Sequence, residues 1–204
     1  MRTLFLSSSG LNESTTKLFW ECIGKEPQNT KVIFVPSAAI ENDAAREGIV
    51  ICLERLMSMG IPISNIFLYD LALLLSDGYK RTYSSYVDDI PTQIRLMNVE
   101  ELSQYDTIVF CGGNASVLLN EVNRTGFSKP LKQAIENGLV YLGISAGSMI
   151  AAGNFADGLG YLTNPLIPHA ETGNPCGKIS NSDSIELSDG QIVLIQGERQ
   201  EIIC

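Results

Sequence analysis

The sequence predicts an α/β protein: a three-layer α/β/α sandwich with a mostly parallel central sheet and a C-terminal β-hairpin. Three observations support this prediction. Short apolar runs alternate with amphipathic stretches of helical spacing, which favours parallel strands joined by helices. Two of these runs end directly in glycine-containing turns. No linker or internal repeat divides the 204 residues, so we expect residues 1–204 to form a single domain.

Five apolar runs are expected to form the parallel strands, because each is short and bounded by turn residues. They cover residues 3–6, 31–35, 63–69, 107–110 and 139–142. Near the C-terminus, residues 192–196 and 200–203 flank a Gly-Glu pair and predict the hairpin. The stretch 70–99 has no clear periodicity, and we expect a tyrosine-rich loop or short hairpin over 79–91.

Helices are expected between the strands, where apolar residues recur three and four positions apart. Asn12 is positioned to cap the first, and the second is expected to run from residue 42 or 43 to about 59. In that second helix, Cys52, Leu56 and Met57 are among the residues predicted to face the sheet. Two more helices are predicted, one with its inner face over 117–122 and one over 130–137.

The charge balance excludes several classes of partner. The formal net charge is −9, and no run of Lys and Arg offers a surface for nucleic acid or acidic membranes. No apolar run approaches the roughly 18 residues that a membrane span needs. The N-terminus becomes polar too soon for a signal peptide, so we expect a cytoplasmic protein, monomeric or homodimeric.

Cysteine and histidine usage argues against metal chemistry. The five cysteines, at positions 22, 52, 111, 176 and 204, form no CxxC pair and are expected to be free thiols. With a single histidine and scattered cysteines, the chain offers no cluster of metal ligands. We therefore expect neither a metal site nor a cofactor.

The segment 143–147, Gly-Ile-Ser-Ala-Gly, is the strongest chemical motif in the chain. It follows the apolar run 139–142 and precedes Ser-Met-Ile-Ala-Ala, which reads as the start of a helix. A strand that turns sharply into a helix strains its apex residue and leaves no room for neighbouring side chains. That is why glycines flank the serine of a nucleophile elbow. The motif predicts Ser145 as a nucleophile.

A serine nucleophile needs a base, and His169 is the only histidine. The third member of such a triad, a carboxylate that orients the imidazole, is left open. Glu171 is one candidate, since residues two apart in an extended segment point to the same side. Asp157, between nucleophile and base, is the other, while Glu186 and Asp189 lie downstream.

Backbone amides for an oxyanion hole are expected from a second turn. Gly112 and Gly113 end a buried strand and open a helix, and the N–H of Ala146 directly follows the nucleophile. Asn114, beside these glycines, is expected to contact the substrate. Cys111 is an alternative nucleophile at the same strand end, although a buried apolar role is more common for such a cysteine.

Four segments together resemble the peptidase E (aspartyl dipeptidase) family of serine peptidases: 110–114, 143–148, 168–169 and 35–38. The resemblance extends from the N-terminus to about Ala152 and includes the terminal hairpin. It implies a cytoplasmic serine hydrolase whose sheet is related to class I glutamine amidotransferases. It also implies Ser145 as nucleophile, His169 as base, and Gly113 with Ala146 as oxyanion donors. The interval between Ser145 and His169 is shorter than expected for the family, and the family's catalytic aspartate lies in this interval.

These observations predict a peptidase E-type hydrolase that cleaves short peptides through a serine acyl-enzyme. Peptidase E removes N-terminal aspartate from dipeptides, and the related cyanophycinases cleave aspartate-linked peptides, so Asp-X dipeptides are the expected substrates. One alternative is a catalytically degenerate relative that binds a small molecule or a protein. Another is an amidotransferase-like protein that acts on a different amide or an ester.

Overall fold

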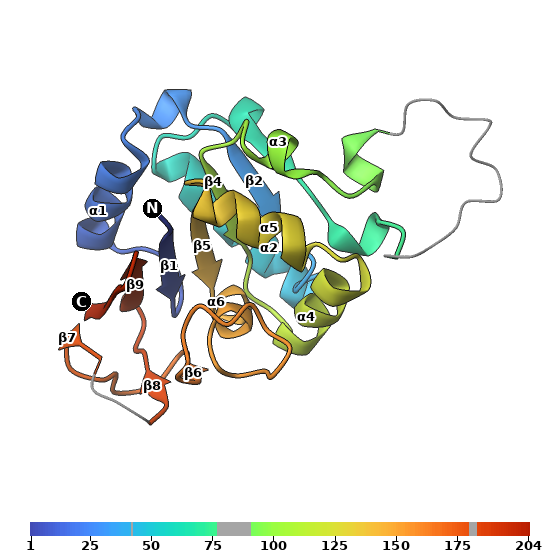
Figure 1. Ribbon diagram of the computed structural model, residues 1–204. Coiled ribbons are helices and arrows are strands. Elements are labelled where there is room, and N and C mark those ends of the chain that lie inside the picture. Colours follow the sequence, from blue (N-terminus) through green and yellow to red (C-terminus); the bar gives the residue numbers. More distant parts are fainter. Residues whose placement is uncertain (42, 77–90, 180–182) are drawn as a thin grey trace.

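An eight-stranded sheet forms the centre of the computed structural model, which describes residues 1–41, 43–76, 91–179 and 183–204 (Figure 1). The strand order is β3-β2-β4-β5-β1-β9-β10-β7. The strands are β1 (Thr3–Ser7), β2 (Val32–Val35), β3 (Ile66–Leu68), β4 (Thr107–Phe110), β5 (Val140–Ile144), β7 (Gly177–Lys178), β9 (Ile192–Gln196) and β10 (Arg199–Ile203). Strands β1 to β5 pair in parallel, whereas β9, β10 and β7 continue the sheet antiparallel.

Helices cover both faces of this sheet. The first two, α1 (Glu13–Ile23) and α2 (Asp43–Ser58), pack on one face. The opposite face carries α3 (Val99–Leu102), α4 (Ala115–Arg124), α5 (Ser128–Glu136) and α6 (Ala146–Ala151). Short 3₁₀ turns connect several of these elements: η1 (Pro27–Asn29), η2 (Ile63–Asn65), η3 (Leu71–Leu73) and η5 (Thr92–Ile94).

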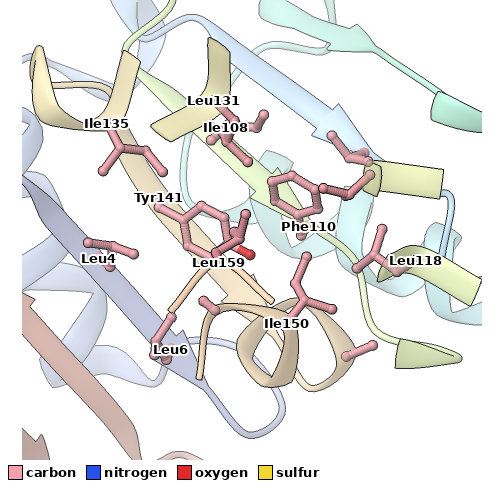
Figure 2. Close-up of a cluster of buried hydrophobic side chains, with 14 of the residues drawn as sticks. Leu4, Leu6, Ile108, Phe110, Leu118, Leu131, Ile135, Tyr141, Ile150 and Leu159 are labelled. Atoms are coloured by element: carbon pink, nitrogen blue, oxygen red, sulfur yellow. The ribbon is translucent and has the colours of Figure 1, made fainter. Parts of the chain in front are cut away.

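Both faces of β1, β2, β4 and β5 are buried, because their side chains point alternately to the two sides of the sheet and helices cover both sides. On β5, Leu142 packs under α1 and α2, whereas Tyr141 packs in the cluster under the other helices. Figure 2 shows that second cluster, in which Tyr141 and Phe110 stack with their ring centroids 5.1 Å apart. This double burial explains the continuous apolar runs in the sequence.

The predicted α/β/α sandwich with its C-terminal hairpin is confirmed, and so is the Asn12 cap. The Asn12 side chain accepts the N–H of Thr15 at 2.9 Å, in a capping box at the start of α1. The predicted strand 63–69 is shorter than expected, because its first residues form η2 and pairing starts at Ile66. The predicted loop or hairpin over 79–91 falls almost wholly outside the described residues.

Two expectations for individual side chains are wrong. Met57 is 41% exposed, because it lies one residue beyond Leu56 and so is rotated away from the helix face that meets the sheet. The expectation of five free thiols fails for Cys176 and Cys204, which form a disulfide with a Cα–Cα distance of 6.0 Å. The antiparallel pairing of β10 with β7 brings these two cysteines together. Because they are 28 residues apart, the sequence alone does not indicate this proximity.

Among the helices that the structure describes, none combines the length and the apolar character required to cross a bilayer. Likewise, the described residues include no group of three or more His, Cys, Asp or Glu side chains placed to hold a metal ion.

Candidate active site

Ser145 lies at the sharp turn between β5 and α6, with φ 49° and ψ −102°. Positive φ is costly for a residue with a Cβ atom, so the surroundings must hold this conformation. A Cβ atom at Gly143 would lie 2.6 Å from the carbonyl carbon of Gly147, and one at Gly147 would lie 2.6 Å from Cβ of Phe110. Only glycine fits either position, which is the geometry of a nucleophile elbow.

Hydrogen bonds to the neighbouring strand fix the elbow. The N–H of Ser145 donates to the carbonyl of Ser7, at the end of β1, over 3.0 Å. The buried hydroxyl of Ser7 donates to the carbonyl of Gly143 over 2.9 Å. From inside the core, the hydroxyl of Tyr141 donates to the carbonyl of Gly147 over 2.6 Å. The strained turn is therefore held from both sides.

The structure brings His169, the residue predicted as the base, next to Ser145. Its Nε2 lies 3.2 Å from Oγ of Ser145, within hydrogen-bonding distance. A two-stranded parallel sheet of β6 (Leu166–Ile167) and β8 (Ile185–Glu186) brings the loop that carries His169 to the elbow. The backbone N–H of His169 donates to Oγ of Ser8, a buried residue after β1, over 2.7 Å.

Asp189 contacts the other nitrogen of the imidazole. Its Oδ1 lies 2.9 Å from Nδ1 of His169, and the same oxygen accepts the hydroxyl of Ser8 at 3.1 Å. The hydrogen bond from His169 is the main reason why the pKa of Asp189 is below its usual value, and the Ser8 hydroxyl lowers it further. Ser145, His169 and Asp189 thus form a continuous hydrogen-bonded chain from hydroxyl to carboxylate.

Neither carboxylate predicted for this position reaches His169. His169 has a φ of 60°, so the chain turns there and the same-side geometry assumed for Glu171 does not apply. Among the hydrogen bonds and ion pairs of the described residues, none joins Glu171 to the imidazole. Asp157 is held elsewhere, since its Oδ2 accepts a hydrogen bond from Asn123 of α4 at 2.8 Å.

The glycine turn after β4 lies beside the elbow, as expected from their neighbouring strands. A Cβ atom at Gly112 would be 3.5 Å from Cβ of Ser145. The N–H of Gly112 lies near the thiols of Cys52 and Cys111 and is among the causes that lower the pKa of Cys52. Within the described part of the chain, the N–H groups of Gly113 and Ala146 have no hydrogen-bond acceptor. These two amides remain as the candidate oxyanion donors.

Asn114 has a structural function that the sequence did not indicate. Its Oδ1 caps α4 by accepting the N–H groups of Ser116 and Val117, at 3.0 and 3.3 Å. Its Nδ2 lies 3.3 Å from a carboxylate oxygen of Glu41, on the exposed side of the turn. Contact between Asn114 and a substrate remains a prediction.

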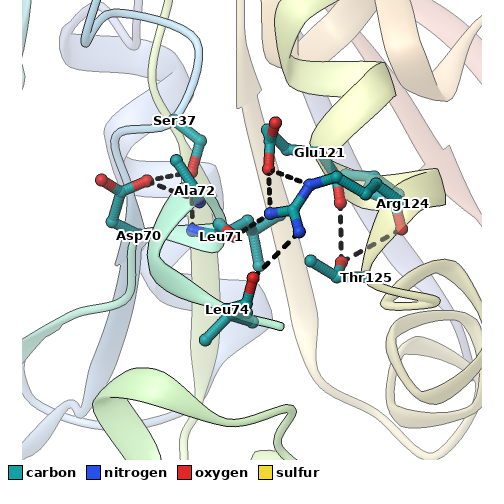
Figure 3. Close-up of polar contacts among 9 residues, drawn as sticks. Ser37, Asp70, Leu71, Ala72, Leu74, Glu121, Arg124 and Thr125 are labelled. Carbon is teal, nitrogen blue, oxygen red and sulfur yellow. Dashed lines mark hydrogen bonds and ion pairs between the residues drawn. The ribbon is translucent and has the colours of Figure 1, made fainter. Parts of the chain in front are cut away.

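The loop after β2 supports this glycine turn from behind. The carbonyl of Ala38 accepts the N–H of Asn114 at 2.7 Å, and it lies so near Gly113 that a Cβ atom there would be 2.1 Å from it. Next to Ala38, the hydroxyl of Ser37 donates to Asp70 over 2.8 Å and accepts the N–H of Leu71 at 2.9 Å (Figure 3).

Arg124, on α4, fixes the same region from the other side. Its guanidinium donates to the carbonyls of Leu71 and Leu74, over 3.0 and 2.9 Å, and also pairs with Glu121 (Figure 3). The turn η3 is therefore tied both to the loop after β2 and to the helix that follows the glycine turn. These contacts join the segments on both sides of the glycine turn.

A cavity of about 490 Å³ adjoins the site on the α1 and α2 side of the sheet. Its lining includes Ser9, Ile144 and Gly190, which are chain neighbours of Ser8, Ser145 and Asp189 respectively. The rest of the lining is largely apolar but includes two charged residues, Glu13 and Arg55, and the guanidinium of Arg55 donates to the carbonyl of Ser9. The cavity thus combines apolar walls with one basic and one acidic side chain next to the candidate triad.

Ser8 and Asp189 belong to the site, but no sequence pattern assigned them to it. A signal for Ser8 exists, because the serine run 7–9 ends a strand that is expected at the same sheet edge as the elbow. For Asp189 there is only its position just before the terminal hairpin. That position becomes informative once β9 is known to lie next to β1.

Comparison with known proteins finds similarity to peptidases. The model of peptidase family S51 matches residues 87–159, a range that includes the elbow and the glycine turn. An uncharacterized peptidase of Listeria monocytogenes is 29% identical over 189 residues, covering 93% of this chain and 75% of the relative. An uncharacterized peptidase of Pasteurella multocida is 38% identical over 66 residues, only 32% of that relative's length.

A crystal structure of a peptidase E-like protein from Listeria monocytogenes has a TM-score of 0.66 at 22% identity. The match covers 100% of this chain and 98% of the Listeria protein. The two proteins therefore share an α/β fold, in which Ser145 of this chain lies at the carboxyl edge of a mostly parallel sheet. The chain is thus similar in sequence to peptidases of family S51 over residues 87–159, and similar in fold to a peptidase E-like protein.

Proposed function

We propose that this protein is a serine-type peptidase that cleaves short peptides, with Ser145 as nucleophile, His169 as general base and Asp189 as the residue that orients His169. The continuous chain of contacts carries the proposal: 3.2 Å from Ser145 Oγ to His169 Nε2, and 2.9 Å from His169 Nδ1 to Asp189 Oδ1. The elbow conformation of Ser145 supports it, because such strain persists only where the surroundings enforce it.

In the proposed reaction, His169 takes the proton of the Ser145 hydroxyl as the oxygen attacks the peptide carbonyl. The N–H groups of Gly113 and Ala146 donate to the oxyanion that forms. His169 then protonates the leaving amine, and water hydrolyses the acyl-enzyme by the same route in reverse. Throughout, Asp189 keeps Nδ1 of the imidazole protonated, so that Nε2 faces the serine.

For the substrate, we propose short peptides with an acidic residue at the cleaved bond, Asp-X dipeptides among them. Similarity to the peptidase E family supports this class, and so does the arginine in the adjoining cavity. The exposed guanidinium of Arg55 keeps N–H groups beyond the one bonded to Ser9, and guanidinium pairs well with carboxylate. The apolar walls would contact the remainder of a small side chain.

A panel of dipeptides that differ only in the first residue tests the proposal. We expect the wild type to release free amino acids from some of them and Ser145→Ala to lose at least about 10³-fold in kcat/KM. If Arg55 selects the acidic residue, Arg55→Gln raises KM for Asp-X peptides about tenfold or more and leaves neutral peptides little changed. Lys17→Gln, an exposed change on α1 outside the cavity lining, is the matched control.

The outcomes separate the alternatives. Equal loss on acidic and neutral peptides in Arg55→Gln removes the specificity assignment but not the peptidase. Turnover in Ser145→Ala equal to that of the wild type excludes the serine mechanism. If every peptide is bound but none is cleaved, the protein is a binding relative that retains the fold.

A further inference from the structure

A pair of buried thiols lies directly behind the glycine turn. Cys111 follows the last residue of β4 and precedes Gly112, and Cys52 lies in the middle of α2. Their sulfur atoms are 3.6 Å apart, and both residues are buried. The two sulfurs are close enough that small movements of the helix and the strand end would bring them to the roughly 2.05 Å of a disulfide.

We propose that Cys52 and Cys111 form a reversible dithiol–disulfide pair that reacts with hydroperoxides, and that closure of the disulfide displaces the glycine turn. This inference concerns chemistry separate from peptide cleavage. Only its effect on turnover rests on the proposed function.

A small oxidant has a route to Cys52. Cys52 retains 7% of its surface accessible and lines the cavity of about 490 Å³ next to the elbow, whereas Cys111 is fully buried. A peroxide would therefore meet Cys52 first, with Cys111 as the resolving thiol. The opposite order would require the oxidant to enter the closed core.

The surroundings also favour the thiolate of Cys52 over that of Cys111. The Cys111 thiol donates to the sulfur of Cys52, and the N–H of Gly112 and the charge of Arg55 act in the same direction, so the pKa of Cys52 is lowered despite burial. Cys111 is the donor in this pair and is desolvated, which raises its pKa. Since the thiolate is the nucleophile, this asymmetry agrees with the order set by access.

The chemistry balances with one equivalent of hydroperoxide. The thiolate of Cys52 attacks the terminal peroxide oxygen, so an S–O bond forms, the O–O bond breaks, and Cys52 becomes a sulfenic acid as the peroxide is reduced to water or alcohol. The sulfur of Cys111 then attacks the sulfenic sulfur. The S–S bond forms, the S–O bond breaks, and hydroxide leaves with the Cys111 proton as water.

Closure would reach the site through Gly112. Disulfide formation shortens the sulfur–sulfur distance by about 1.5 Å. A Cβ atom on Gly112 would lie only 3.5 Å from Cβ of Ser145, and the next amide is the candidate oxyanion donor Gly113. Because an oxyanion donor must be placed to within a few tenths of an ångström, we expect such a shift to lower turnover.

Thiol mapping of the intact protein tests the pair directly. The protein is treated with increasing hydrogen peroxide, unfolded, alkylated with N-ethylmaleimide and mapped by mass spectrometry. We expect label at Cys52 and Cys111 to disappear together, a linked peptide to appear, and dithiothreitol to reverse the change. The free thiol of Cys22 is the internal control, since it has no partner thiol among the described residues and is expected to keep its label.

A variant pair fixes the order of reaction and guards against misfolding. Cys111→Ser should leave a dimedone-reactive sulfenic acid at Cys52, whereas Cys52→Ser should leave Cys111 unreactive. Oxidation of Cys22 before the pair, linkage of either thiol to any other cysteine, or sulfenic acid at Cys111 in Cys52→Ser would overturn the proposal.

The effect of the disulfide on turnover is measured separately, as kcat before and after peroxide treatment. We expect peroxide to lower kcat at least about tenfold in the wild type, reversibly, because loss of one oxyanion donor costs about 10²–10³-fold. Cys52→Ser is expected to be insensitive. A linked pair with unchanged kcat would overturn the displacement of the glycine turn. A protein that forms the pair but cleaves no peptide would refute the proposed function and leave the dithiol intact.

Discussion

Replacing Asp189 with asparagine tests the geometry of the site most specifically. The change keeps the shape of the side chain and removes its charge, and the new amide can donate to Nδ1 of His169. The imidazole is then stabilised with its proton on Nε2, the nitrogen 3.2 Å from Ser145 Oγ, where a base must be unprotonated. We therefore expect kcat to fall while substrate binding changes little.

The expected size follows from the exposure of the pair. A hydrogen bond to a charged group contributes about 1.5–3 kcal/mol, and about 1.4 kcal/mol corresponds to a tenfold change in rate. The side chains of His169 and Asp189 are 54% and 67% exposed, so solvent screens their interaction. We expect a loss of about 10–50-fold in kcat/KM, smaller than the ~10⁴-fold typical of a buried triad carboxylate.

The assay measures kcat/KM on the best dipeptide of the panel, with the thermal midpoint of each variant as a check on folding. Glu171→Gln and Asp157→Asn are the controls, and each is expected to change kcat/KM less than about threefold, because neither side chain contacts His169. If either control loses more activity than Asp189→Asn, the assignment of Asp189 is wrong.

The same variant has a signature in stability. Because the folded-state pKa of Asp189 is lowered, its contribution to folding is present above the ordinary carboxylate pKa of about 4 and is lost as the pH falls through the lowered value. The difference in free energy of unfolding between the wild type and Asp189→Asn should therefore shrink as the pH falls below about 4. Urea titrations at a series of pH values measure it, and a difference that grows on acidification contradicts the assigned cause.

Three further substitutions test the support of the site. Ser8→Ala removes the hydroxyl that joins base and acid, and should lower kcat about tenfold with a small change in thermal midpoint. Gly147→Ala forces a Cβ atom to 2.6 Å from that of Phe110, and should destabilise folding by about 1–3 kcal/mol or more in urea titrations. Arg124→Gln loses two carbonyl contacts of a half-buried guanidinium and should cost about 1–2 kcal/mol. Unchanged stability in either of the last two would contradict the packing described above.

The local features of this protein were predictable from its sequence. The elbow depends on residues within five positions of each other, since Gly143 and Gly147 clear the space around Ser145. The cap at Asn12 and the alternation of strands and helices are local in the same sense. His169 could be assigned by elimination, because the chain has one histidine.

The remaining features depend on contacts between distant segments. Asp189 reaches His169 only because β6 pairs with β8 and because β9 returns beside β1. The contact between Cys111, just before the glycine turn, and Cys52 on α2 joins residues 59 positions apart. Sequence spacing favoured Glu171, but the turn at His169 removes the extended geometry on which that prediction relied.

Labelling with a fluorophosphonate, followed by intact mass and peptide mapping, tests the central claim most directly. We expect one covalent adduct on Ser145 in the wild type and none on Ser145→Ala. Labelling of His169→Ala should be slower by at least about 10²-fold, since the base activates the hydroxyl. No adduct on folded wild-type protein, or equal rates for the wild type and His169→Ala, would contradict the assignment of Ser145 and His169 as a nucleophile and its base.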